Sequence, residues 1–370
     1  MSEAHSATGA GVTAAAAFSD PGSPAAPART IPFEFHATGG EYFRIWIVNL
    51  LLTIVSLGIY SAWAKVRRLR YLYGNTRLDQ TVFEYHGRPL QILKGRLIAS
   101  GAYAVFYVAA QIKPWAAIAF LPLAAFGVPW IIMRSRRFQM HMTSYRGLRF
   151  RFTGGYGAAL RAYVGWPLLA ALTLGFLIPR SIWEQVNYLL SKSHYGTEQA
   201  RFTTARGVFY KFYYVTMGLS VMLGAAALGV FAALAATADS EGESSLAALT
   251  TTSGVALFVA VVVLYMLLFA YYQKSYLNAS FNGLELGPHR VESSLQTWPL
   301  FVLYLSNFVL IVLTVGLYSP WAKVRQMQYQ LSQLRVVAWG DLDQFIAAAG
   351  EGVDAIGEEV GDFFDLDFGL

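Results

Sequence analysis

Seven apolar runs dominate the sequence, and their lengths constrain the fold more than any other feature. A helix that crosses a membrane needs about 20 mostly apolar residues, within a range of about 17–25. Five runs reach that length, whereas the second and fourth are shorter. The runs cover residues 42–60, 97–112, 115–133, 163–178, 212–236, 251–272 and 298–318. These lengths predict an all-α membrane protein, built as a multi-pass bundle of transmembrane helices.

The composition supports lipid as the main solvent of this chain. Hydrophobic residues make up 55% of the sequence and charged residues only 14%, whereas a soluble domain carries about 25% charged residues. Cysteine is absent, which excludes disulfides, thiolate metal ligands and cysteine nucleophiles.

An internal repeat relates the two ends of the apolar region. A shift of 258 aligns residues 43–71 with 301–329 without a gap, and it matches Asn49 with Asn307 and Gly58 with Gly316. A fainter third copy, at a shift of 117, covers residues 174–188 but lacks the Trp-Ala-Lys-Val-Arg block. We therefore predict repeated units at about 40–156, 157–297 and 298–336.

The repeated block has the composition of a membrane-interface anchor. Tyrosine and tryptophan rings favour the headgroup level, and lysine and arginine meet lipid phosphates just beyond it. The predicted anchors are Tyr60, Trp63, Lys65, Arg67, Tyr318, Trp321, Lys323 and Arg325. Because basic residues flank apolar runs in this way, we expect anionic lipid headgroups as partners and no nucleic acid.

Four short segments alternate aromatic or apolar residues with charged ones, which is the period of a β-strand. They are 33–35, 83–85, 150–152 and, more weakly, 200–202. Turn-like stretches precede most of them. The pattern predicts short β-hairpins at the membrane interface that pair with one another.

Two tails flank the membrane domain, which we place at residues 33–336. Residues 1–32 are rich in Ala, Ser, Gly and Pro and are predicted to be disordered. The segment 337–370 is acidic, with nine carboxylates and no Lys or Arg after residue 340. Its aromatic residues Phe363, Phe364 and Phe368 suit a segment that docks a protein partner.

Charge predicts the orientation. The segments 65–96 and 134–161 carry net charges of +6 and +7, which places them in the cytoplasm by the positive-inside rule. Seven spans then put the N-terminus outside and the C-terminus in the cytoplasm. In the alternative, the three repeated segments, or at least the fourth run, enter and leave the membrane from one face.

No catalytic, cofactor-binding or metal-binding pattern is present, and we expect no enzyme. None of the six histidines has metal-ligand spacing on a helix, although His36 and His86 share a Phe-Glu-aromatic context. Asn49 and Asn307 occupy equivalent places in the apolar repeats. They either form hydrogen bonds between helices or line a pathway.

Several motifs resemble the YjgN-like family of bacterial inner-membrane proteins. They are residues 40–46, 58–67, 71–76, 93–96 and 143–150, within a match that covers about residues 33–335. The resemblance implies a multi-pass protein of the bacterial inner membrane with no established molecular function. Because repeated odd-membered units often build a site at their interface, we expect a permease or channel-like protein for an unidentified solute or lipid. The alternative is a non-catalytic membrane scaffold that recruits partners through the acidic tail.

Overall fold

Ten short strands form a closed antiparallel barrel in the computed structural model, which describes residues 28–113, 115–238 and 244–350. The order around the barrel is β1-β10-β9-β8-β7-β6-β5-β4-β3-β2. The strands are β1 (Arg29–Phe35), β2 (Thr76–Leu78), β3 (Thr81–Tyr85), β4 (Thr143–Tyr145), β5 (Leu148–Phe152), β6 (Ser193–Tyr195), β7 (Glu198–Phe202), β8 (Leu284–Leu286), β9 (His289–Ser293) and β10 (Leu334–Ala338).

Consecutive strands pair as four hairpins, and the two ends of the described chain close the ring. Each hairpin pairs with the next, as Phe83 of β3 does with Tyr145 of β4. At the closure, Arg29 of β1 lies opposite Ala338 of β10. The four segments with aromatic alternation lie in β1, β3, β5 and β7, so each of them is part of a strand. Their partners in the barrel are the even-numbered strands.

The barrel interior is packed with side chains. Ile31, Tyr145 and Tyr195 are buried there, and Phe83 and Phe150 pack against them. The Tyr145 hydroxyl donates to the Leu78 carbonyl at 2.7 Å, and the Tyr195 hydroxyl donates to the Tyr145 carbonyl at 2.9 Å. Buried tyrosines need such partners, so the lumen is an aromatic core. The strands have 3–7 residues, fewer than the 9–11 of a transmembrane strand.

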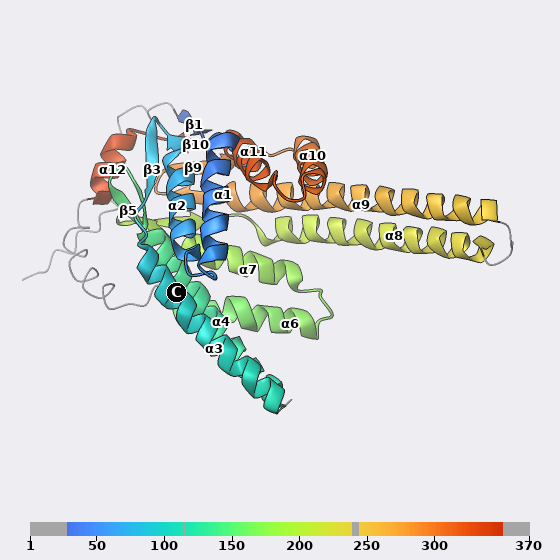
Figure 1. Cartoon of the computed structure of the whole chain (residues 1–370). Helices are drawn as coiled ribbons and strands as arrows, with labels where there is room; N and C mark the ends of the chain where they lie inside the picture. Colours follow the sequence, from blue (N-terminus) through green and yellow to red (C-terminus); the bar gives the residue numbers. More distant parts are fainter. Residues whose placement is uncertain (1–27, 114, 239–243, 351–370) are drawn as a thin grey trace, which may run out of the picture.

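Helix α12 (Leu342–Gly350) covers one end of the barrel (Figure 1). Its Phe345 is buried against the His289 ring, with centroids 4.3 Å apart. The Ala349 carbonyl accepts from the Thr197 amide at 2.9 Å, and Asp343 pairs with Arg146 of the β4–β5 turn. This helix therefore contacts the turns of several hairpins.

Helical hairpins join the strands, and each one leaves the barrel and returns to it (Figure 1). The long ones are α3 (Pro89–Ile112) with α4 (Trp115–His141), and α8 (Arg206–Ala238) with α9 (Ser244–Phe281). The short ones are α1 (Gly39–Val55) with α2 (Ser61–Gly74), α6 (Trp166–Leu172) with α7 (Ile178–Ser191), and α10 (Thr297–Leu313) with α11 (Ser319–Ser332). Helix α5 (Tyr156–Leu160) and the π-helical turn η2 (Arg161–Gly165) lead into α6.

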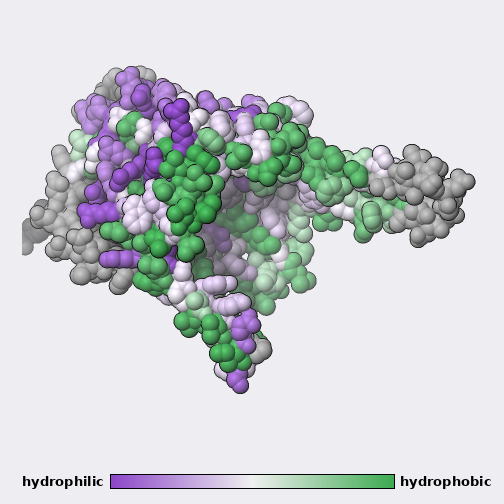
Figure 2. Space-filling model, in the orientation of Figure 1, coloured by the Kyte–Doolittle hydropathy of each residue, from purple (hydrophilic) through white to green (hydrophobic). Residues whose placement is uncertain are grey.

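Three of the described helical segments are long and apolar enough to cross a membrane: Pro89–Ile112, Arg206–Leu234 and Thr252–Phe281. They belong to the two long hairpins, which extend away from α12 (Figure 1). Figure 2 shows hydrophobic residues over the helical hairpins and hydrophilic residues over the barrel. The barrel is thus the polar end of the molecule.

The three short hairpins turn in the same way. Leu57, Leu174 and Val315 each have a positive φ of 50–51°, and each is followed by a glycine at φ of 89–92°. These three side chains are 94%, 89% and 91% exposed. In each turn the glycine N–H donates to a helix carbonyl five residues back, at 2.7–2.8 Å. The side chains of Ser56, Thr173 and Thr314 accept from a further backbone N–H. The exposed apolar tips therefore keep their backbone groups paired, as lipid requires.

The predicted all-α bundle with about seven spans is therefore wrong. The strands form a closed ten-stranded barrel instead of a few short interfacial hairpins, and the first, fourth and seventh apolar runs turn back. Helix α1 has 17 residues, about 26 Å at 1.5 Å per residue, which is less than the ~30 Å of a bilayer core. Each of these three runs reverses direction within the structure. The alternative, in which the repeated segments enter and leave the membrane from one face, stays a prediction.

The tails fall only partly within the described residues. Strand β10 crosses the boundary that we placed at residue 336, and α12 lies within the acidic segment. Residues 1–27 and 351–370, with Phe363, Phe364 and Phe368, lie outside the described residues. The disordered N-terminal tail and the boundaries of the repeats stay predictions.

Candidate functional site

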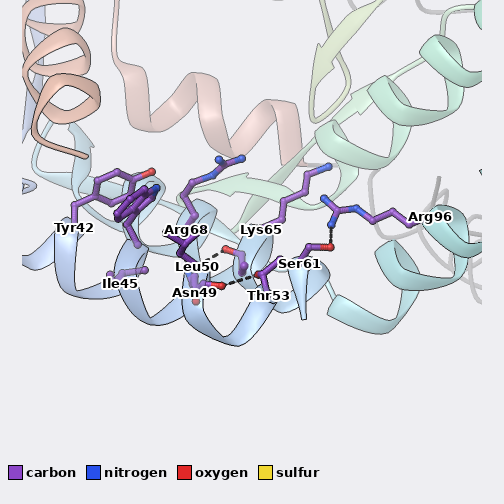
Figure 3. Close-up of a pocket in the computed structure, with 11 residues that line it drawn as sticks. Tyr42, Ile45, Asn49, Leu50, Thr53, Ser61, Lys65, Arg68 and Arg96 are labelled. Atoms are coloured by element: carbon purple, nitrogen blue, oxygen red, sulfur yellow. Dashed lines mark hydrogen bonds between the residues drawn. The ribbon is translucent and has the colours of Figure 1, made fainter. Parts of the chain in front are cut away.

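A pocket of about 210 Å³ lies where the first short hairpin meets α3 (Figure 3). Helices α1 and α2 form most of its wall, and α3 contributes one residue. Its polar lining residues are Tyr42, Asn49, Thr53, Ser61, Lys65, Arg68 and Arg96. Most of these residues come from a hairpin whose tip is apolar and exposed, so the pocket lies between that tip and the barrel.

Three cations line the pocket, and its lining contains no carboxylate. Figure 3 shows the charged ends of Lys65, Arg68 and Arg96 on one side of the hairpin. Burial lowers the pKa of Lys65 from its ordinary value of 10.5, and the charges of Arg96 and Arg68 lower it further. Among the described residues none of the three forms an ion pair. The electrostatics of the pocket therefore favour an anion.

Hydrogen bonds hold part of this lining in place. Arg96 donates to the Ser61 hydroxyl, which joins α3 to the start of α2. The Tyr42 hydroxyl interacts with Arg68, although burial is the larger effect and raises the pKa of Tyr42. Two of the three cations are thus positioned by neutral partners and keep their charge available to a ligand.

Asn49 gives the pocket an unsatisfied polar atom. Its side chain is 7% exposed, and its Nδ2 donates to the Ala64 carbonyl at 3.5 Å, across to α2. Its Oδ1 is buried and has no hydrogen-bond partner. A buried acceptor without a donor costs about 1–3 kcal/mol, and this oxygen bears that cost beneath the surface of the pocket.

The equivalent place in the last hairpin is closed by its own side chains. Asn307 donates to the Ala322 carbonyl at 3.4 Å, as Asn49 does to Ala64, but its Oδ1 accepts from Arg325 at 2.8 Å. Moreover, Arg68 is matched by Gln326 at a shift of 258 and by Gln185 at a shift of 117. The cation cluster is therefore particular to the first hairpin.

The outer wall of the pocket is apolar. Ile45, Trp46 and Leu50 of α1 line it, and Leu50 and its neighbour Leu51 are 38% and 56% exposed. Cations behind an exposed apolar wall match the cross-section of a bilayer, where phosphates lie just outside the acyl chains. The arrangement suits the phosphate of a lipid.

Comparison with known proteins identifies the family of this chain. Residues 30–363 match the family described as "Bacterial protein of unknown function (DUF898)". The chain belongs to this family. Two relatives of this DUF898 protein are named "Inner membrane protein YjgN". The one from Escherichia coli (strain K12) is 32% identical over 151 residues, which is 39% of this chain and 36% of the relative. The one from Salmonella typhimurium is 30% identical over 122 residues, which is 32% of this chain and 30% of the relative.

These relatives confirm the predicted resemblance to YjgN, a bacterial inner-membrane protein by name. The matched stretches span about a third of the length of those relatives. No solved structure matches this DUF898 chain. The comparisons therefore give a family and the location of its named members, without a molecular activity.

The predicted anchors of this DUF898 protein lie at the starts of α2 and α11. Tyr60 stacks on Trp63 at 6.1 Å, and Tyr318 stacks on Trp321 at 5.9 Å. Trp321 also stacks on Phe43 of α1 at 4.6 Å. Of the four predicted cations, Lys65 lines the pocket, and Lys323 lies near Arg68 in a second lining. Arg325 donates to Asn307, and Arg67 is exposed. The two tryptophans thus also take part in packing, and their role as lipid anchors stays a prediction.

Sequence reasoning missed Arg68 and Arg96 as members of a site. They lie 28 positions apart, on different helices, and only the tertiary fold brings them together. One signal was present, because the aligned repeats place glutamine opposite Arg68. A cation present in one copy alone indicates a function that the other copies do not share.

Proposed function

We propose that this protein is a lipid-binding protein of the bacterial inner membrane, which holds the phosphate of an anionic phospholipid in the pocket of Lys65, Arg68 and Arg96. The observation that carries the proposal is this cluster of three cations without a carboxylate, set behind an exposed apolar wall. Arginine and lysine are the side chains that bind phosphate groups best.

The proposed topology places the barrel in the cytoplasm and the long hairpins across the membrane as four spans. The basic segments 65–96, 134–161, 180–211 and 319–340 then share one side, with net charges of +6, +7, +3 and +3. The segment 237–250, between the two longest helices, has a net charge of −3 and lies on the other side. This arrangement puts the four basic segments in the cytoplasm and the acidic segment outside, as the positive-inside rule favours. The α3–α4 turn, which carries the single cation Lys113, lies on the outer side. Both ends of the described chain are then in the cytoplasm.

The predicted permease or channel is less well supported than lipid binding. A path along the barrel axis would have to pass Tyr145, Phe150 and Tyr195, which pack the lumen, and then α12. The predicted scaffold depends on residues 351–370, which lie outside the described residues, and it stays a prediction.

The test is lipid binding to the purified full-length protein. Dissociation constants for phosphatidylglycerol and phosphatidylcholine would be measured by native mass spectrometry. The Arg68→Gln variant carries the residue of the two related hairpins, and the matched control, Arg77→Gln, removes an exposed cation of β2. A hydrogen bond to a charged group contributes about 1.5–3 kcal/mol, so Arg68→Gln should weaken phosphatidylglycerol binding by about tenfold or more.

Arg77→Gln should leave the affinity nearly unchanged. Equal affinities of the wild type for the two lipids would refute the proposal. An equal, small loss in both variants would also refute it, since this result would indicate diffuse attraction of about 1 kcal/mol per charge instead of a binding pocket.

A further inference from the structure

A second pocket, of about 530 Å³, begins where the cationic pocket ends. It lies between α2 and α11, next to the barrel. Leu69 and Leu72 of α2 form one wall, and Met327 and Leu331 of α11 form the other. Of these four side chains Leu72 is buried, and the others are half-buried. The walls are therefore mainly aliphatic, and Tyr73 of α2 adds an aromatic ring to them.

The floor of the second pocket is aromatic. Phe33 of β1 and Phe83 of β3 line it, and their rings stack with centroids 6.2 Å apart. Both rings also pack against the barrel core. The pocket thus extends apolar surface from the barrel toward the membrane helices, and its chemistry suits a hydrocarbon.

Arg68 and Lys323 form the charged rim of the second pocket. Neither forms an ion pair among the described residues, and no carboxylate belongs to this lining. Thr76 has a hydroxyl there, but it already donates to the Leu72 carbonyl at 2.9 Å. A ligand that is anionic at one end and apolar at the other would complement this division of charge.

Both pockets lie along one face of α2. Ser61, Lys65 and Arg68 line the first, and Arg68 and Leu72 line the second. Their spacing of four, three and four residues keeps them on one side of the helix. Arg68 belongs to both linings, so a single ligand bound through Arg68 can reach either pocket.

We propose that the second pocket holds an acyl chain of the phospholipid whose phosphate binds Arg68. This inference rests on the proposed function and extends it, because the chain would lie on the barrel side of the phosphate, outside the bilayer. Burial of the methylene groups against Leu72, Met327 and Leu331 would replace the contact that the chain loses with lipid. The protein would then hold a lipid that is partly withdrawn from the membrane.

The test is photo-crosslinking in nanodiscs of phosphatidylcholine that contain a phosphatidylglycerol probe with a diazirine near the end of one acyl chain. Labelled peptides would be mapped by mass spectrometry. We expect label on the α2 and α11 peptides that contain Leu72 and Met327, in addition to label on the lipid-exposed faces of α3, α8 and α9.

The variant Met327→Trp fills the second pocket without a change of charge and should reduce its label by at least tenfold. The matched control is Met217→Trp, at a residue of α8 that is 44% exposed, and it should leave the pocket label unchanged. The thermal midpoint of each variant reports whether it folds. Should Met327→Trp unfold the protein, Leu331→Phe would replace it.

The outcomes separate this inference from the proposed function. Wild-type label confined to α3, α8 and α9 would overturn the acyl-chain pocket, even if Arg68→Gln weakens the binding of phosphatidylglycerol. Label in the second pocket that Met327→Trp removes supports the inference. If Arg68→Gln leaves both the affinity and this label unchanged, Arg68 does not bind the phosphate, and both the proposed phosphate site and the acyl-chain pocket that depends on it are wrong.

Discussion

Replacement of Phe345 by alanine should release α12 from the barrel. The Phe345 side chain is 6% exposed and lies against His289 in the aromatic core. Removal of a buried phenylalanine side chain costs about 3–5 kcal/mol. A free helix of 9 residues is too short to persist in water, so tertiary contacts must hold α12 in place. The loss should therefore appear as local opening of α12 and not as global unfolding.

Hydrogen exchange of the Thr197 amide measures this opening directly. The amide donates to the Ala349 carbonyl at 2.9 Å, and it loses that partner when α12 departs. At about 1.4 kcal/mol for each factor of ten, the protection factor of the Thr197 amide should fall by about a hundredfold or more. The loss cannot exceed the factor that corresponds to the whole free energy of docking of α12.

Gln344→Ala is the matched control, because Gln344 is exposed on the same helix; it should leave protection unchanged. Amides in the β1–β10 ladder should also be unaffected. If the Thr197 amide exchanges at the same rate in both variants, Phe345 does not hold the helix and the reasoning fails.

Three further predictions concern the barrel and its orientation. Gly196→Ala should displace α12, because the new Cβ would lie 2.1 Å from a carbonyl oxygen of that helix, at a φ of +59°. The control Gly147→Ala has open space around its Cβ at a φ of +79°, so it should cost only about 1–2 kcal/mol of backbone strain. Equal losses of thermal stability in the two variants would contradict the steric argument. Burial lowers the pKa of His289 from its ordinary value of 6.5, and release of α12 exposes the ring, so that it binds protons more readily. Docking of α12 should therefore weaken as the pH falls below about 6.5. In His289→Gln the exchange rate of the Thr197 amide should lose this pH dependence. Single cysteines in place of Arg77 and Gln199 should react with an impermeant thiol reagent from the same side of the membrane, whereas labelling from opposite sides would restore the model of seven spans.

The alternation of residues predicted individual strands, but it could not predict the barrel. Residues 33–35 and 83–85 carry the two-residue period clearly, and both are strands. Strands β2, β4, β6 and β8 have three residues each, which is too short for a period to stand out. Pairing between hairpins also joins residues that lie far apart in the sequence, from Phe152 with Ser193 to Ala200 with Leu286, and no local pattern records it.

The short hairpins were mistaken for spans because an apolar run has the same composition whether it crosses the bilayer or turns back. The decisive feature is a single pair of left-handed residues, such as Leu57 with Gly58. Glycine was visible in all three copies, but leucine at a positive φ is uncommon. Only the structure shows that the chain reverses there.

Helix α12 illustrates a signal that was present and overlooked. Leu342, Phe345, Ile346 and Ala349 recur at the spacing of one helical face, and all four belong to the barrel contact. The acidic character of the whole segment concealed this short pattern. The candidate site was even harder to predict from the sequence, because Arg68 and Arg96 line one pocket only through the packing of α2 against α3.

The pairing of β1 with β10 constrains the order in which the protein folds during its synthesis. The ribosome makes Arg29 near the start and Ala338 near the end, yet the two lie opposite each other. Contacts between such distant residues form slowly, so under the proposed topology the intervening helices enter the bilayer while the ring is still open. Until the last strand emerges, β1 has an unpaired edge that invites association with other chains. A ribosome that stops short of residue 334 would leave that edge exposed permanently.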